Sequence, residues 1–96
     1  VSRFPEMRRD LALTVNAEQE VAAMLATARS NAGEHLQDLT LFDVYQGEGI
    51  EAGKKSLALG LTWQHPSRTL TDEEINLLVN QIVSSLSEEY QAVLRS

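Results

Sequence analysis

The segment 56–63 constrains the fold of this chain more than any other part of the sequence. Large and small side chains alternate along it without a break. A period of two is typical of a strand that buries one face, because successive side chains point to opposite sides of a sheet. We therefore expect a strand with one buried apolar face and one face of small residues. The large residues are Leu57, Leu59, Leu61 and Trp63, and the small residues are Ser56, Ala58, Gly60 and Thr62.

Three other segments also have the features of strands. Residues 8–15 alternate, with Leu11, Leu13 and Val15 on the apolar face. Residues 39–46 predict a second strand, and residues 90–95 predict a short final one. Each has a period of two, so each is expected to lie in a sheet with one face buried and the other exposed.

Two helices are expected between these strands. The first spans 17–32, with Asn16 as its N-cap, because an asparagine side chain can accept a hydrogen bond from the free amides of the first turn. The second spans 72–89 and begins with a capping box formed by Thr71 and Glu74. Both have apolar residues at helical spacing, so each is expected to bury one stripe against the sheet.

The order of elements is therefore strand, helix, strand, strand, helix, strand. Right-handed crossovers place both helices of such a chain on one face of the sheet. The expected fold class is α+β, a ferredoxin-like βαββαβ sandwich with a four-stranded antiparallel sheet. Ninety-six residues allow one small domain, which we expect to span 6–96 after a lead-in at 1–5. Because the chain begins at Val1 without an initiating methionine, we expect a piece of a longer protein.

Composition excludes several classes of protein. The chain has no cysteine, which excludes a disulfide scaffold, a thiolate zinc site and a cysteine nucleophile. No apolar run approaches the roughly 20 residues of a membrane span, so we expect a soluble, cytoplasmic protein without a membrane partner. The two predicted helices carry the whole net charge of −6, while acids and bases balance elsewhere. That charge disfavours nonspecific binding to nucleic acid.

The face of the sheet away from the helices is the candidate site. In the strand 39–46, Phe42 and Val44 are expected on the buried face, and Leu41, Asp43 and Tyr45 are expected to point outward. Tyr45 can stack on a base, and Asp43 accepts hydrogen bonds only, which suits the paired donors of guanine. An exposed tyrosine and aspartate can also be ordinary solvated surface, and spacing alone favours neither interpretation over the other. The expected phosphate-binding or second-base residues are Arg95, Arg8, Arg9, Lys54 and Lys55.

Four segments resemble a known family, in the correct order and spacing over nearly the whole chain. They are RRDLAL at 8–13, LFDVYQGEG at 41–49, GKKSLA at 53–58 and RTLTDEE at 68–74. Together they are similar to the C-terminal ferredoxin-fold anticodon-binding domain of bacterial phenylalanyl-tRNA synthetase β chains. The resemblance implies binding of the anticodon loop of phenylalanine tRNA, whose first anticodon base is guanine.

The resemblance also assigns roles to residues. It implies that Asp43 recognises the first base and Tyr45 stacks on it, that Ser56 and Ala12 line the same site, and that Arg95 reaches the anticodon. Family members often carry a basic residue after the Asp-x-Tyr pair, where this chain has Gln46, and Glu48 follows it. We therefore expect weaker neutralisation of phosphates at this point.

The resemblance places the chemistry in other parts of a larger enzyme. It implies an (αβ)₂ parent in which the α chain binds ATP, Mg²⁺ and phenylalanine. The expected partners of this segment are the tRNA, the remainder of the β chain and the α chain. No catalytic residue, metal ligand or cofactor is expected within the segment itself.

Other interpretations have less support in the sequence. Gly53-Lys54-Lys55 lacks the remaining residues of a phosphate-binding loop and joins two strands. His35 and His65 are far apart in the sequence, and neither has a second ligand at metal-site spacing. An RNA-recognition motif would need aromatic residues on its third strand, where this chain has small ones. A small-molecule regulatory domain and a purely structural interaction domain remain as alternatives.

Overall fold

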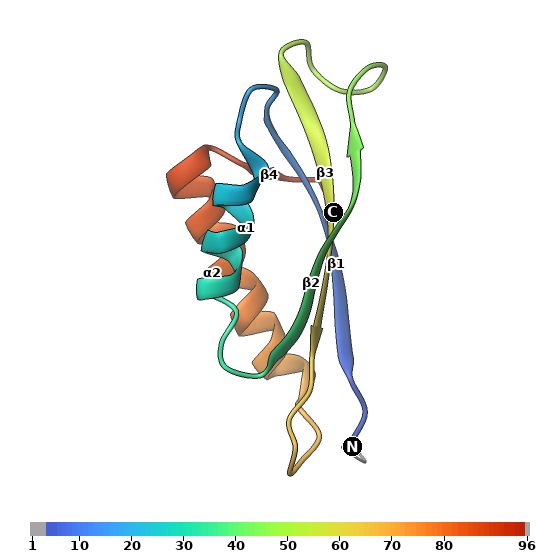
Figure 1. Ribbon diagram of the computed structural model, residues 1–96, viewed down its shortest axis with the longest axis vertical. Coiled ribbons are helices and arrows are strands. Elements are labelled where there is room, and N and C mark those ends of the chain that lie inside the picture. The colour runs from blue at the N-terminus through green and yellow to red at the C-terminus, as the bar shows by residue number, and fades with distance from the viewer. Residues whose placement is uncertain (1–3, 96) are drawn as a thin grey trace.

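Residues 4–95, the part of the chain that the computed structural model describes, form four strands and two helices (Figure 1). The predicted lead-in at 1–5 therefore lies largely outside the described residues. The order of elements confirms the predicted ferredoxin-like arrangement. The elements are β1 (Met7–Asn16), α1 (Val21–Ser30), β2 (Leu36–Tyr45), β3 (Lys54–Trp63), α2 (Asp72–Tyr90) and β4 (Val93–Leu94).

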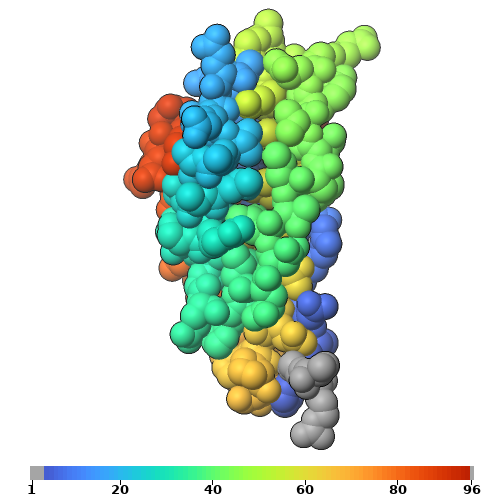
Figure 2. Space-filling model, viewed as in Figure 1, coloured from blue at the N-terminus to red at the C-terminus, as the bar shows by residue number. Residues whose placement is uncertain are grey.

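The sheet has the strand order β2-β3-β1-β4, and every neighbouring pair is antiparallel. Both helices lie on the same side of this sheet (Figure 1). The other side, which we call the open face, carries no element of the described chain. The connection between β2 and β3, residues 46–53, projects at one end of the elongated molecule, beyond both helices (Figures 1 and 2).

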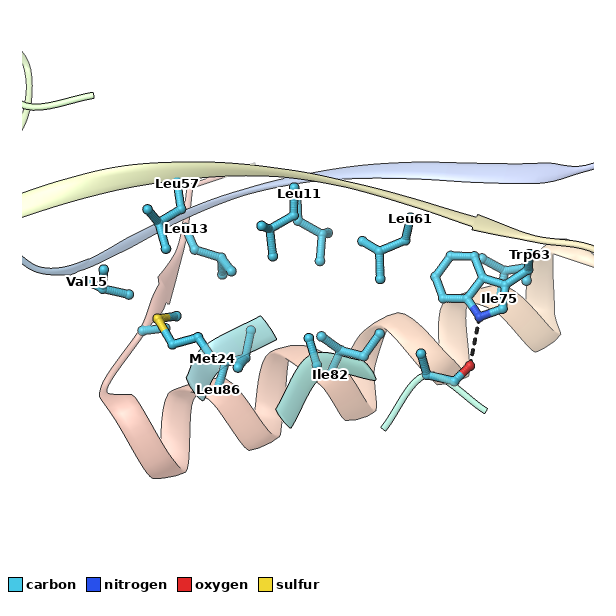
Figure 3. Packing of buried hydrophobic residues seen from close by; sticks show 14 of the residues in the cluster. Leu11, Leu13, Val15, Met24, Leu57, Leu61, Trp63, Ile75, Ile82 and Leu86 are labelled. Atoms are coloured by element: carbon cyan, nitrogen blue, oxygen red, sulfur yellow. Dashed lines mark hydrogen bonds between the residues drawn. The ribbon is translucent and has the colours of Figure 1, made fainter. Parts of the chain in front are cut away.

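The core lies between the helices and the apolar face of β1 and β3 (Figure 3). The alternation predicted for β3 is confirmed, since all four of its large apolar residues are at most 1% exposed. At one end, Trp63 Nε1 donates a 2.7 Å hydrogen bond to the carbonyl of Ala32, after the last residue of α1. This bond satisfies a buried indole N–H and joins β3 to the helix layer. The side chains that α2 contributes most deeply are Ile75, Ile82 and Leu86.

The two helices begin differently. α2 begins as predicted, because the Thr71 hydroxyl accepts a 3.2 Å hydrogen bond from the backbone N–H of Glu74. The predicted start of α1 is wrong: Asn16 is the last residue of β1, and the helix begins at Val21 without a side-chain cap on Glu20. Pairing between Asn16 and Lys54 extends the strand and prevents an earlier helix start.

β2 departs from the regular alternation that the sequence analysis assumed. Its pairing with β3 shifts between Leu36 and Asp38 and again between Leu41 and Asp43. At the second shift Phe42 is the extra residue of a β-bulge. Because of this extra residue, the in-and-out alternation of side chains before Phe42 is shifted by one residue relative to the alternation after it. The bulge corrects two predictions, because Leu41 packs against the core and Phe42 is 52% exposed.

The bulge leaves the other two outward predictions intact. Asp43 lies opposite Ala58 and Tyr45 lies opposite Ser56, and both partners belong to the small-residue face of β3. Val44 lies opposite Leu57 and is therefore on the predicted side, but it is 49% exposed. The last strand is also shorter than predicted, since α2 continues to Tyr90 and β4 has only two residues.

Candidate nucleic-acid interface

Three neighbouring strands bring the predicted base-contacting residues together on the open face. Across the sheet, Tyr45, Ser56 and Thr14 form one row, because each is paired with the next. In the adjacent row, Asp43 lies opposite Ala58, which lies opposite Ala12. Directly paired residues on one face have Cβ atoms roughly 5 Å apart. The tyrosine ring and the aspartate therefore stand at one edge of a surface formed by small side chains.

The last strand adds a guanidinium group to this surface. The backbone N–H of Arg95 donates a 2.6 Å hydrogen bond to the carbonyl of Ala12, which continues the pairing of β4 with β1. The Arg95 side chain then extends across the sheet, and its Nη1 donates a 3.0 Å hydrogen bond to Ser56 Oγ. Ser56 is only 7% exposed. Residues from β1, β2 and β3 thus lie together on the open face with Arg95, which directly follows β4.

The Tyr45 ring is restrained by the loop that follows it. Its hydroxyl donates a 2.8 Å hydrogen bond to the backbone carbonyl of Glu48. Between them, Gly47 has a φ of 129°, and a Cβ at this position would lie 3.4 Å from the tyrosine oxygen. Glu48 therefore positions Tyr45 through its backbone, a role that sequence reasoning missed because it considered only the charge of the side chain.

The Asp43 carboxylate is exposed and uncommitted. Among residues 4–95 it makes no hydrogen bond or ion pair, so both oxygens can accept from a ligand. The residues beside it, Ala58 and Ala12, are small and half-buried. A planar group can therefore approach the sheet closely while its edge reaches the carboxylate. This arrangement suits a flat, hydrogen-bond-donating ligand better than a bulky one.

Arg8 and Asp10 lie farther along the open face. Arg8 Nε donates a 2.9 Å hydrogen bond to Asp10 Oδ1, and the guanidinium carbon lies 6.0 Å from the centre of the Phe42 ring. Phe42 was predicted to be buried, so the sequence analysis did not include it in the site. No feature of the local sequence pattern indicates the bulge, so the sequence could not identify Phe42 as an exposed residue.

Two of the predicted basic residues, Arg9 and Lys55, lie on the helix side of the sheet, and Lys54 lies on the same side as Ser56. Arg9 lies on the helix side, where its Nη2 is 2.9 Å from Asp72 Oδ1 at the start of α2. Lys55 also lies on the helix side and donates to the carbonyl of Gln19 at 2.8 Å. Lys54 is at the end of the sheet and donates to Asn16 Oδ1 at 2.8 Å. Their contact with RNA stays a prediction, and the structure engages each of them in an internal bond.

The two histidines, which the sequence analysis treated as distant, are neighbours in the structure. The rings of His35 and His65 have centroids 4.2 Å apart and are tilted by 42°. The extension of the β2–β3 ladder explains this contact, because Gln64 N donates to the carbonyl of His35 at 3.0 Å. Within residues 4–95 no group of three or more potential ligands is arranged to hold a metal ion.

No helix in the described part of the chain has both the length and the apolar character needed to cross a bilayer. The residues of the open face themselves indicate what it can bind. Around Tyr45 those residues combine an aromatic ring, the free Asp43 carboxylate and the anchored Arg95 guanidinium. Such a flat surface with an exposed ring suits stacking, which needs no deep cavity.

Comparison with known proteins agrees with this geometry. Residues 2–95 match the family model for the ferredoxin-fold anticodon binding domain. The chain is 57% identical over 95 residues to the phenylalanine–tRNA ligase beta subunit of Pseudomonas fluorescens (strain Pf0-1), with 99% of this chain and 12% of the relative covered. The same subunit of Pseudomonas syringae pv. tomato is 58% identical over 95 residues, with the same coverage.

A more distant relative extends the same match. The phenylalanine–tRNA ligase beta subunit of Acinetobacter baylyi is 46% identical over 96 residues, covering all of this chain and 12% of the relative. The chain thus spans about an eighth of the length of these curated relatives. With the match to the family model over almost its full length, the chain belongs to the ferredoxin-fold anticodon-binding domain family.

Proposed function

We propose that this chain is the anticodon-recognition segment of a phenylalanine–tRNA ligase β chain and binds the anticodon loop of phenylalanine tRNA on its open face. In this proposal the first anticodon base, guanine, stacks on Tyr45 and donates its Watson–Crick edge to Asp43. Ser56, Ala12 and Arg95 line the same position. The domain extends over 6–96.

The observation that carries the proposal is the free Asp43 carboxylate beside an exposed, restrained Tyr45 ring. Guanine presents two donor groups next to each other on its Watson–Crick edge, and an ionised carboxylate can accept both. A base stacked on the ring contributes about 1–3 kcal/mol whatever its identity. The carboxylate therefore provides the choice of guanine, while the ring provides much of the affinity.

The aminoacylation chemistry is placed outside this segment. The proposal assigns ATP, Mg²⁺ and phenylalanine to the α chain of an (αβ)₂ parent enzyme that acts in the cytoplasm. This segment then supplies binding energy and orientation at the anticodon end of the tRNA. Its partners within that enzyme are the remainder of the β chain and the α chain.

The test is an NMR titration of the isotope-labelled chain with an anticodon stem-loop of phenylalanine tRNA. Two control RNAs are used, one with a scrambled loop and one with adenine in place of the first anticodon guanine. We expect backbone shifts at Asp43, Tyr45 and Ser56 with the authentic loop only. Equal shifts with all three RNAs would contradict base recognition.

Asp43→Asn is the matched variant for base choice, because it keeps the size of the side chain and removes its exclusively accepting character. We expect this variant to bind the guanine and adenine loops with similar affinity. If it still prefers guanine as strongly as the wild-type chain does, Asp43 does not recognise the base. Stabilisation of the chain by free amino acids in a thermal-shift screen would instead favour a regulatory domain.

A further inference from the structure

A second group of residues on the open face is not part of the Tyr45 position, and the sequence analysis assigned a role only to its Arg8. It consists of Phe42, Arg8, Asp10 and Gly60. Phe42 belongs to β2, Arg8 and Asp10 belong to β1, and Gly60 lies between them on β3. The group thus spans three neighbouring strands, as the Tyr45 position does.

The Phe42 ring is exposed because of the bulge. A regular β2 would have turned this side chain toward the helices, and the extra residue turns it to the open face instead. Phe42 is 52% exposed there, more than Tyr45 at 43%. Bulges commonly redirect one side chain at a functional site. The result is a second aromatic surface on the same face as Tyr45.

Arg8 is held in place beside this ring. Asp10 accepts its Nε–H at 2.9 Å, which leaves the terminal nitrogens of the guanidinium to donate to another acceptor. Gly60 makes this position available, because a Cβ on residue 60 would lie only 2.5 Å from Arg8 Nη2 and 3.1 Å from its Cζ. The guanidinium therefore lies directly against the backbone of β3, with its carbon 6.0 Å from the centre of the Phe42 ring.

We propose that Phe42 and Arg8 form a second nucleotide-binding position, where an unpaired base of the same RNA loop stacks on Phe42 and its phosphate accepts from Arg8. This inference rests on the proposed function, since it concerns the same RNA. Base stacking on an aromatic side chain together with a nearby guanidinium is how single-stranded RNA is commonly held without strict sequence choice.

The second position takes a base other than the one on Tyr45. Tyr45 lies opposite Ser56, and Phe42 lies between the residues paired with Leu59 and Ala58, two to three residues farther along β3. At roughly 3.3 Å per residue the two rings are attached about 7–10 Å apart along the strand. A base stacked on Tyr45 therefore leaves the Phe42 ring available to the next part of the loop, whose phosphate would meet Arg8 against Gly60.

The test measures the affinity of the 96-residue chain for phenylalanine anticodon stem-loops by fluorescence anisotropy. Each stem-loop carries one abasic nucleotide at a different loop position. The proteins are the wild-type chain, Phe42→Ala, Tyr45→Ala and the control Val44→Ala. Val44 is a suitable control because it is 49% exposed on the same strand but lies on the opposite side of the sheet.

With the intact loop we expect Phe42→Ala to bind about 5- to 150-fold more weakly and Val44→Ala to bind like the wild-type chain. The loss in Phe42→Ala should disappear when one particular loop base, other than the first anticodon base, is already missing. The loss in Tyr45→Ala should disappear only when the first anticodon base is missing. Phe42→Leu, which keeps an apolar side chain without a ring, should show most of the loss.

The possible failures are distinguishable. If the wild-type chain binds the authentic loop no better than a scrambled one, the proposed function fails. If the wild-type chain binds and Tyr45→Ala weakens it, but Phe42→Ala does not, the second position is wrong while the proposed function stands. The second position is also wrong if both variants lose their effect with the same abasic nucleotide, since they would then contact one base.

Gly60→Ala tests the part played by Arg8. The added methyl group displaces the guanidinium without changing any charge or aromatic residue. We expect weaker binding and a lower salt dependence, by about 0.7 in the slope of log K against log salt for one lost phosphate contact. Arg8→Gln should reduce the slope equally. An unchanged slope in both variants would show that Arg8 does not contact the phosphate.

Discussion

β2 and β3 are neighbours in the sheet, yet they serve different purposes. β3 alternates without interruption, and its large side chains are the centre of the core. β2 contains two register shifts and exposes Phe42, Val44 and Tyr45. The regular strand β3 therefore provides the stability and the flat base of the site. The irregular edge strand β2 provides the side chains that a ligand would contact.

Deleting one residue from each strand should produce the largest contrast. Removal of Ala58 from β3 would turn every large side chain on one side of the deletion to the open face, because the alternation has a period of two. We expect a chain without cooperative unfolding. Removal of Phe42 takes out only the extra residue of the bulge and leaves Asp43 and Tyr45 outward, so the chain should remain folded. Circular dichroism during urea unfolding measures both.

If the Phe42 deletion also unfolds the chain, β2 contributes more to stability than its exposure indicates. Its RNA binding is equally informative when it folds. The Tyr45 position should be retained and the second position lost, so the variant should bind like Phe42→Ala.

Large-to-small substitutions of two directly paired leucines should also distinguish β3 from β2, with a smaller difference in stability than the deletions. Leu59 is 1% exposed and lies opposite Leu41, which only packs against the margin of the core. Leu59→Ala should lower the free energy of unfolding by about 2–5 kcal/mol. Leu41→Ala should cost clearly less, because the space left by a half-buried side chain is open to solvent. Equal losses in urea titrations would contradict the division between the strands.

For RNA binding, in contrast to stability, a substitution in β2 should have a larger effect than a substitution in β3. Tyr45→Ala removes the stacking surface and should weaken binding to the anticodon stem-loop by about 1–3 kcal/mol with little change in stability. Ser56→Ala removes only the acceptor of Arg95 and should cost less, near the 0.5–1.5 kcal/mol of a typical hydrogen bond. Fluorescence anisotropy gives both values, and a greater loss for Ser56→Ala would place the main contact on β3.

The smallest expected effect is a pH dependence of stability that arises from a carboxylate in α2, outside both strands. It serves as a control on the stability measurements. The hydrogen bond from Arg68 lowers the pKa of Glu74 from its ordinary value of 4.5, with a contribution from Thr71. The stability this carboxylate contributes is present above that ordinary value and is lost as the pH falls through the lowered pKa. Arg68→Gln should flatten this part of the acid profile slightly. The leucine variants should keep its shape.

Much of the fold could be predicted because the local signals were consistent with one another. The alternation in 56–63 and the Thr71 cap each agree with the surrounding pattern, and both are confirmed. The start of α1 was mispredicted because Asn16 has two competing uses. It is a good N-cap, but its backbone pairs with Lys54 in the ladder of β1 and β3. That competition involves a residue 38 positions away, so local propensity could not decide it.

The candidate site was predictable only in part, for a similar reason. The outward positions of Asp43 and Tyr45 were expected, although by an alternation that ignored the bulge between Leu41 and Asp43. Arg9 and Lys55 look like available cations in the sequence, but the regular alternation of β1 and β3 places both on the helix side, together with Leu11 and Leu57. Phe42 looks like a core residue, and the bulge in β2 exposes it. For Phe42, one extra residue in the strand decides the side of the sheet.

The amino-acid sequence by itself determined the order of elements, the apolar face of β3 and the family to which the chain belongs, because these depend on periodicity and on motifs close along the chain. Tertiary structure alone decided that Arg95 reaches Ser56, that Glu48 restrains Tyr45 and that Phe42 lies beside Arg8. These contacts depend on strand register and on one bulge. Both arise from the packing of whole strands against the core, so they cannot be predicted from the short-range pattern of the sequence.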